Sequence, residues 1–333
     1  MFRTITVSLL LLLLVAASAP AWAGDTFHLT ILHTNDLHGM MLPHEYELGG
    51  EERELGGMAR LATAISQYRE RSENCAVVDC GDVFTRGPWH TRFYGEPEIE
   101  AMNLMGYDML VVGNNELKPI WGDIASEDMM LSLMRRSRFP WLSASLTLGD
   151  GPPPGSDALA FVEGMHPFIV RMFGTVRVGF VGLTCDPPPD YDWLRGWTIG
   201  DPVAAAKRWV PFARRYCDVL IVVMHIGSDE GRELAGQVDG IDAFVGGHAH
   251  EFLSPPLMLK GPTGREVPMA EAGEMGVVLG VFDLEFEKVE DGSWRLTEAG
   301  NRLVPIDSTF AEDPAVRGLL ERYPAPVKAP ASQ

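Results

Sequence analysis

The chain has 333 residues, of which 46% are hydrophobic and 22% charged, so wholesale disorder is excluded and a sizeable core is possible. Its formal net charge is −19, which argues against binding of nucleic acid through bulk electrostatics. An anionic substrate would be repelled at long range unless bound cations reverse the field locally. The length alone suggests about two domains, but no internal linker or repeat divides the chain.

The N-terminal segment is expected to direct export rather than to fold. Arg3 is its only charged residue, and six consecutive leucines occupy positions 9–14 of an apolar stretch. Pro20 ends this stretch, and Ala21-Trp22-Ala23 has the small-x-small form of a cleavage site. We therefore predict a signal peptide over 1–23 and a periplasmic or secreted mature chain without membrane association. An uncleaved N-terminal anchor is the alternative.

Hydrophobic periodicity predicts strands that alternate with helices. In chain order it predicts a strand at 27–34, a helix at 58–71, a strand at 76–79, a helix at 96–105, a strand at 108–112, a helix at 127–136, a strand at 140–146, a hairpin of 170–173 with 176–183, a helix at 203–216, strands at 219–224 and 243–245, a β-meander over 276–305, and a helix at 313–323. This alternation predicts an α/β layered domain over 24–323, followed by a flexible tail over 324–333.

The four cysteines, Cys75, Cys80, Cys185 and Cys217, are too few for a disulfide scaffold. No CxxC motif is present, so a thiolate zinc site is not expected. We predict free, buried thiols, with a bridge between Cys75 and Cys217 as the alternative.

Side chains that commonly bind metals follow five of the predicted strands. Open α/β sheets place their sites at the carboxyl ends of strands, so we expect these residues to converge. They are Asp36, His38, Asp82, Asn114, His225, His248 and His250.

Seven ligands are too many for one cation and suit two that share a bridging residue. Oxygen and nitrogen donors without thiolate favour Mn, Fe or Zn over Ca or Cu(I). Two divalent ions about 3.5–4 Å apart can hold a bridging hydroxide and bind a phosphoryl group. The pattern therefore indicates metal-dependent hydrolysis of a phosphate ester.

The order of these motifs resembles the calcineurin-like metallophosphoesterases, and the flanking stretches 32–39, 93–97, 103–108 and 271–280 are similar to their 5′-nucleotidase branch. The resemblance covers about residues 27–323 and implies a four-layer α/β/β/α sandwich. It also implies two ligand sets that share Asp82 as the bridge: Asp36, His38, Asp82 and His250 for one ion, and Asp82, Asn114, His225 and His248 for the other.

One motif departs from the family pattern, which reads Gly-Asn-His-Glu and, one residue later, Asp. Here Asn115 replaces the His and Lys118 replaces the Asp. An amide cannot supply a proton, although it can donate a hydrogen bond. Three interpretations remain open: Asn115 and Lys118 contact the phosphoryl oxygens, or His90 or else His44 serves as the acid, or the chain binds its ligand without turnover.

The sequence therefore predicts an exported dinuclear-metal hydrolase in which metal-bound hydroxide attacks phosphorus in line. The expected substrates are nucleotide-like or other small phosphomonoesters, and no nucleic-acid or protein partner is expected. Nucleotidases of the resembled branch carry a further base-stacking domain, which we expect this chain to lack, so strict 5′-nucleotidase specificity is not expected. The alternatives are a hydrolase of a sulfur oxyanion ester and a non-catalytic, metal-dependent anion-binding protein.

Overall fold

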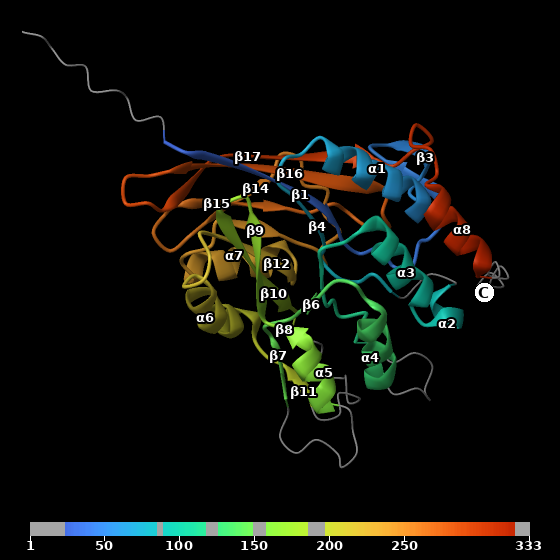
Figure 1. Cartoon of the computed structure of the whole chain (residues 1–333), viewed down its shortest axis with the longest axis horizontal. Helices are drawn as coiled ribbons and strands as arrows, with labels where there is room; N and C mark the ends of the chain where they lie inside the picture. The colour runs from blue at the N-terminus through green and yellow to red at the C-terminus, as the bar shows by residue number, and fades with distance from the viewer. Residues whose placement is uncertain (1–23, 85–88, 118–125, 149–157, 186–196, 324–333) are drawn as a thin grey trace, which may run out of the picture.

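The computed structural model describes residues 24–84, 89–117, 126–148, 158–185 and 197–323 (Figure 1). The predicted signal peptide, Lys118 and the predicted tail lie outside the described residues. No helix among the described residues is long and apolar enough to cross a membrane.

The first of two large sheets has seven strands in the order β17-β16-β1-β4-β5-β6-β8. Five neighbouring strands are parallel, and the last two strands of the chain add to one edge in antiparallel orientation. The bounds are β1 (Thr26–Thr34), β4 (Cys75–Asp79), β5 (Met109–Val111), β6 (Trp141–Leu142), β8 (Met165–His166), β16 (Val278–Lys288) and β17 (Trp294–Pro305).

The second sheet has six strands in the order β14-β15-β13-β12-β10-β9. Its four central strands are parallel, and its two edge strands are antiparallel to their neighbours. The bounds are β9 (Phe168–Phe173), β10 (Val176–Thr184), β12 (Val219–His225), β13 (Ala243–Val245), β14 (Leu257–Lys260) and β15 (Glu266–Ala270).

Helices cover the outer face of each sheet (Figure 1). The first sheet is covered by α1 (Met58–Glu70), α3 (Glu96–Met105), α4 (Ser126–Arg136) and α8 (Pro314–Arg322), and the second by α6 (Pro202–Ala213) and α7 (Ser228–Gln237). Shorter elements connect these layers: α2 (His90–Phe93), α5 (Ala158–Gly164), β2 (His44–Leu48), β3 (Glu51–Leu55), β7 (Leu146–Leu148) and β11 (Trp197–Ile199).

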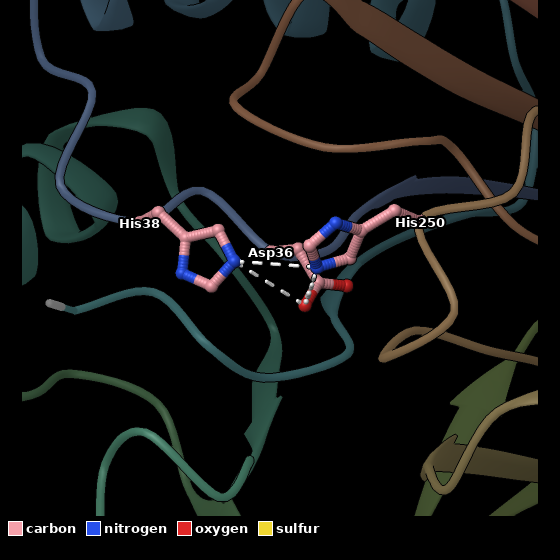
Figure 2. A group of neighbouring side chains, drawn as sticks. All are labelled: Asp36, His38 and His250. Atoms are coloured by element: carbon pink, nitrogen blue, oxygen red, sulfur yellow. Dashed lines mark hydrogen bonds and ion pairs between the residues drawn. The ribbon is translucent and has the colours of Figure 1, made fainter. Parts of the chain in front are cut away.

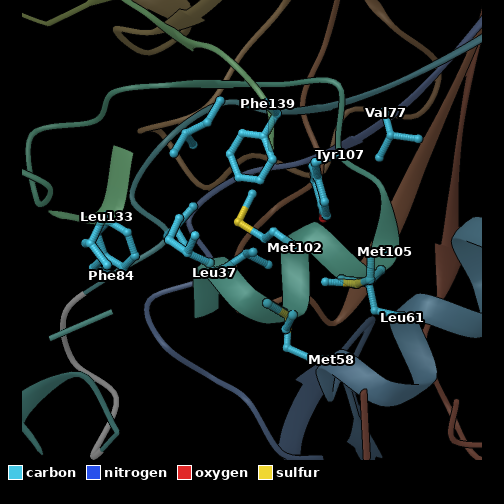
Figure 3. Close-up of a cluster of buried hydrophobic side chains, with 14 of the residues drawn as sticks. Leu37, Met58, Leu61, Val77, Phe84, Met102, Met105, Tyr107, Leu133 and Phe139 are labelled. Carbon is cyan, nitrogen blue, oxygen red and sulfur yellow. The ribbon is translucent and has the colours of Figure 1, made fainter. Parts of the chain in front are cut away.

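Three clusters of buried apolar side chains separate four layers of secondary structure, which confirms the predicted α/β/β/α sandwich. Strand residues alternate between the two faces of a sheet, so Leu29 and Ile31 of β1 lie between the sheets while Leu32 packs toward the helices. Figure 3 shows part of the helix-side layer, where Met102 and Met105 of α3 lie near Leu61 of α1. A third cluster joins the second sheet to α6 and α7.

Some sequence predictions about elements need correction. The β-meander predicted over 276–305 is a hairpin of two long strands, β16 and β17. The strand predicted at 140–146 is two short strands in different sheets, because the Ala144 N–H donates to the carbonyl of Gly182 in the second sheet (2.7 Å). The β2–β3 hairpin was not predicted because its strands are rich in glutamate, and α7 was missed because small and charged residues obscure its period. All four cysteines are free, as expected, although Cys75 and Cys185 are only partly buried.

Glu98 of α3 is a fully buried carboxyl in an otherwise apolar layer. Neither of its oxygens has a hydrogen-bond partner on another described residue. Burial raises the pKa of Glu98 to about 7, because ionisation without a partner is costly in the interior. This pKa is higher than that of the same carboxyl in the unfolded chain. The protonated carboxyl therefore favours the folded state at low pH, and this contribution to the free energy of unfolding is lost as the pH rises through about 7.

We therefore expect the stability advantage of Glu98→Gln over the wild type to be about 2 kcal/mol larger at pH 8.5 than at pH 5.5. Urea denaturation at the two pH values measures this difference. The exposed Glu285→Gln serves as the matched control. An equal pH dependence in the wild type and Glu98→Gln would show that Glu98 does not resist ionisation.

Candidate metal centre

The predicted ligands meet where the two sheets end. Asp36 and His38 follow β1, Asp82 follows β4 and Asn114 follows β5, so the first sheet supplies four of them. The second sheet supplies the last residue of β12 and two residues after β13, which are His225, His248 and His250. The structure thus brings all seven into two adjoining clusters.

Figure 2 shows the first cluster, in which Asp36, His38 and His250 point toward one another. The Asp36 Oδ1 atom lies 3.1 Å from Nε2 of His250 and 3.7 Å from Nε2 of His38. The two imidazole Nε2 atoms are 3.3 Å apart. Asp36 and His38 are fully buried, whereas His250 is partly exposed.

The second cluster contains Asn114, His225 and His248. The Asn114 Oδ1 atom lies 3.2 Å from His225 Nε2 and 3.1 Å from His248 Nδ1, and these two nitrogens are 3.3 Å apart. Asp82 adjoins them, with its Oδ1 atom 3.4 Å from His225 Nε2. Ligand atoms of Asp36, Asp82 and His225 also lie within 4.8 Å of one another, which links the two clusters.

These spacings fit divalent metal binding. Ligand atoms about 2.1 Å from an ion, at angles between octahedral and tetrahedral values, are about 3.0–3.4 Å apart. Most distances within the clusters fall in that range. The donors are carboxylate, amide and imidazole, which suit a first-row divalent ion.

Five of the predicted ligands have a left-handed backbone conformation. Asp36, His38, Asp82, His248 and His250 all have positive φ angles, between 50° and 83°. Such a conformation is uncommon for residues other than glycine and costs about 1–3 kcal/mol where it is strained. Its concentration in five of the seven predicted ligands is typical of a functional site.

Neighbouring groups orient several of these side chains. The His225 Nδ1–H donates to the carbonyl of Cys80 (2.8 Å), which leaves Nε2 as the atom facing the second cluster. The Asn35 amide donates to Asp36 Oδ2 (2.8 Å), and the Asn35 Oδ1 atom accepts from the Ala272 N–H (2.9 Å). On His250, Nδ1 is 3.0 Å from Glu274 Oε2.

Glu274 is a site residue that the sequence analysis missed, because no spacing relates it to His250. We expect Glu274→Gln to weaken metal binding about tenfold, at the low end of the range for such outer partners, since the charge that orients the imidazole is lost. Competition with a chromogenic chelator measures the affinity. Glu285→Gln is the exposed control, and equal affinities for the two variants would contradict this role.

Glu116 joins the two loops that carry Asp82 and Asn114. Its Oε2 atom accepts the N–H groups of Asp82 (2.8 Å) and Gly113 (2.7 Å), and its Oε1 atom accepts from Phe84 (3.2 Å). A side chain at Gly113 would overlap Asp82, so glycine is required there. In the sequence, Glu116 is part of the motif at 113–116. Its position in that motif did not indicate that its carboxylate would bind the backbone of both loops.

We expect Glu116→Gln to lower the free energy of unfolding by about 1–3 kcal/mol, because its amide group would face a backbone N–H and leave a buried donor unpaired. Urea denaturation at neutral pH measures the loss, with Glu285→Gln as control. Equal stability of the two variants would show that Glu116 does not hold the loops together.

The field in the site favours cations. Burial lowers the pKa of His225, but the Asp82 carboxylate outweighs this and raises the pKa to about 10. Burial acts in the opposite sense on Asp82, and the charge of His225 holds its pKa well below the usual value. Burial and the charge of Asp82 raise the pKa of Glu116 to about 7. The negative field that raises the pKa of His225 would also attract a metal cation, whose binding would release a proton from this side chain.

The catalytic candidates differ in how close they lie to the two clusters and in whether the structure describes their side chains. Asn115 is buried, its N–H donates to Asp82 Oδ1 (2.7 Å), and its amide also contacts Asp82 Oδ2. His44 packs edge-on against Tyr46, with ring centroids 6.2 Å apart, in the β2–β3 hairpin, and its Nδ1 atom lies 3.3 Å from the carbonyl of Leu42. The backbone of His90 begins α2, but its side chain lies outside the described part of the structure, as does Lys118.

Comparisons with known proteins define the class. The family model described as calcineurin-like phosphoesterase matches residues 29–252, which is more than half of the chain. The chain therefore belongs to the calcineurin-like phosphoesterase family.

Among the curated relatives, rat 5′-nucleotidase is 29% identical over 333 residues, which cover 94% of this chain and 55% of that protein. A solved 5′-nucleotidase precursor from Thermus thermophilus is 26% identical, with a TM-score of 0.74, and covers 89% of this chain and 58% of its own. A sulfate thiohydrolase from the same species shares the fold at 19% identity and a TM-score of 0.71, covering 89% of this chain and 60% of its own. The chain spans about half the length of the curated relatives it matches.

Proposed function

We propose that this protein is an exported, dinuclear-metal phosphomonoesterase that acts on small phosphate esters. The observation that carries the proposal is the convergence of seven metal-binding side chains into two clusters that adjoin at Asp36 and Asp82. Relatives named as 5′-nucleotidases support the class of reaction. The specific ester is not limited to nucleotides in this proposal.

In this proposal Asp36, His38, Asp82 and His250 hold one ion, and Asp82, Asn114, His225 and His248 hold the other. Bound divalent ions would stabilise charge on the phosphoryl oxygens and activate water for attack on phosphorus. Asp82 is suited to the shared position because its carboxylate lies 3.4 Å from His225 Nε2, its ligand atom is within 4.8 Å of that of Asp36, and a carboxylate has two oxygens that can each bind an ion.

In this proposal Asn115, which stands at the position of the family's His, contributes little to the departure of the leaving group. Asn115 offers a neutral N–H donor beside Asp82, and an amide cannot protonate the departing alcohol. Positive charge from the ions offsets the repulsion between a phosphate and a chain of net charge −19. We therefore expect esters with good leaving groups, such as p-nitrophenyl phosphate, to be hydrolysed faster than alkyl phosphates.

Export is part of the proposal and is supported by the N-terminal sequence, with its single arginine, leucine run and small-x-small site. Expression with and without residues 1–23, followed by fractionation and N-terminal sequencing, tests it. A mature N-terminus near Gly24 in the exported fraction is expected, and retention of residues 1–23 would contradict cleavage.

A non-catalytic, metal-dependent anion-binding protein is the second candidate, and Asn115 at the position of the family's His is the observation that favours it. Removal of metal with a chelator and restoration with Mn²⁺ separates the two candidates. The proposed enzyme loses and regains hydrolysis of p-nitrophenyl phosphate. A binding protein shows metal-dependent retention of inorganic phosphate, with no hydrolysis in any metal state.

A further inference from the structure

A cavity of about 440 Å³ opens beside the second cluster of candidate ligands. It lies between α6 and α7, which pack against each other on the outer face of the second sheet (Figure 1). His248 forms part of its wall, and so does Cys185, whose Sγ atom is 3.9 Å from Asn114 Oδ1. The volume is in the range of small-molecule sites, and the wall includes one candidate metal ligand, His248, and a cysteine beside another, Asn114.

Most charged groups in this wall are acidic. The described lining contains three carboxylates, from Asp201, Glu230 and Glu233, and one ammonium, from Lys207. A Cβ placed on Gly227 would lie 3.3 Å from Glu230 Oε2 and 3.6 Å from the His248 ring, so the Glu230 carboxylate lies beside that candidate ligand.

The Lys207 ammonium group forms a hydrogen bond across the cavity. Lys207 of α6 donates to Gln237 Oε1 of α7 (2.6 Å), and the Gln237 amide donates to Glu233 Oε1 (3.0 Å). The Asp201 carboxylate accepts the Val203 N–H (2.9 Å) at the start of α6, so it caps that helix while keeping its charge. The cavity therefore has a net negative wall of hydrogen-bonding groups.

The described part of this wall has the chemistry of a site for a polar cation rather than for a nucleobase. Apart from His248, no described lining residue is aromatic, so the described wall offers no stacking surface. An anionic leaving group would be repelled by Glu230 and Glu233. A small polar group with positive charge would meet complementary charge and hydrogen-bond acceptors.

We propose that this cavity binds the alcohol portion of the substrate and selects amino-alcohol phosphates, of which phosphoethanolamine is the simplest. This inference rests on the proposed phosphoesterase function. Hydrolysis breaks the bond between phosphorus and the alcohol oxygen, forms one from phosphorus to a water oxygen, and leaves the alcohol with a proton from that water. The ammonium group of the alcohol lies against Glu230 and Glu233 throughout.

The test compares kcat/KM of the full-length, Mn²⁺-loaded protein for phosphoethanolamine, glycerol 3-phosphate and 3-phosphoglycerate, which carry cationic, neutral and anionic alcohols. We expect that order of preference. In the double variant Glu230→Gln/Glu233→Gln, the ratio of phosphoethanolamine to glycerol 3-phosphate should fall about three- to tenfold, because exposed ion pairs contribute up to about fivefold each. The exposed Glu298→Gln on β17 should leave the ratio unchanged.

The outcomes separate this inference from the proposed function. Suppose that the protein hydrolyses p-nitrophenyl phosphate in a metal-dependent way but does not prefer phosphoethanolamine, or that the double variant keeps the wild-type ratio of kcat/KM for phosphoethanolamine to that for glycerol 3-phosphate. Either result overturns the role of the cavity and leaves the proposed phosphoesterase function intact. A preference for adenosine monophosphate over phosphoethanolamine also overturns it. Failure to hydrolyse any phosphate ester in the metal-loaded state overturns the proposed function instead.

Discussion

Asp82→Asn is expected to abolish metal-dependent hydrolysis of p-nitrophenyl phosphate and to lower the metal content of the purified protein. One Asp82 oxygen lies 3.4 Å from His225 Nε2 of the second cluster, and ligand atoms of Asp82 and Asp36, which belongs to the first cluster, lie within 4.8 Å of each other. An amide carries no charge and binds a cation through one oxygen only, so it cannot replace a shared carboxylate. Removal of a residue that only orients a metal ligand lowers metal affinity or activity about 10–100-fold. The loss of activity in Asp82→Asn should be much larger than this.

The control for this prediction is Asp25→Asn, which makes the same change at a carboxyl whose side chain is 76% exposed beside Lys288. Its activity and metal content should match the wild type. Metal content is measured by atomic emission after exhaustive dialysis, and hydrolysis by release of p-nitrophenolate. Unchanged metal content and turnover in Asp82→Asn would show that the site does not bind metal through this carboxylate.

Restoring the family's His and Asp is expected to accelerate hydrolysis of alkyl phosphates by about 10²–10⁴-fold, the usual contribution of general acid catalysis. The double variant is Asn115→His/Lys118→Asp. The gain should be large for poor leaving groups and small for p-nitrophenyl phosphate, because only an alkoxide needs the proton. The single variant Asn115→Gln keeps the amide and serves as the control.

The comparison of the two esters decides among the interpretations of Asn115. An unchanged rate for alkyl phosphates in the double variant, together with a large loss in His90→Asn, would contradict the account and identify His90 as the acid. Equal acceleration of both esters would show that the substitutions act on binding rather than on leaving-group protonation.

The sequence predicted the class of fold because each layer depends on local patterns. The apolar runs around Ile31, Val78 and Val222 alternate with helical stretches, and chain order then favours parallel strands under covering helices. The β2–β3 hairpin and α7 were not predictable in this way. The hairpin pairs glutamate-rich strands, and α7 packs only Leu234, Ala235 and two smaller residues into the core.

The sequence predicted the site residues that lie at the ends of strands. It did not predict those that reach the site only through contacts between distant parts of the chain. Each of the seven ligands follows or ends a strand, and the carboxyl ends of parallel strands meet at one edge of a sheet. Glu274 lies 24 positions after His250 in the chain and reaches it only through the fold. The cavity between α6 and α7 was equally invisible, because α7 was not predicted.

A crystal structure of the mature protein grown with Mn²⁺, with anomalous data collected to locate the ions, tests the central claim most directly. The account predicts two anomalous peaks about 3.5–4 Å apart, one bound by Asp36, His38 and His250 and one by Asn114, His225 and His248, with Asp82 binding both. A single peak, or two peaks that do not share Asp82, would contradict it.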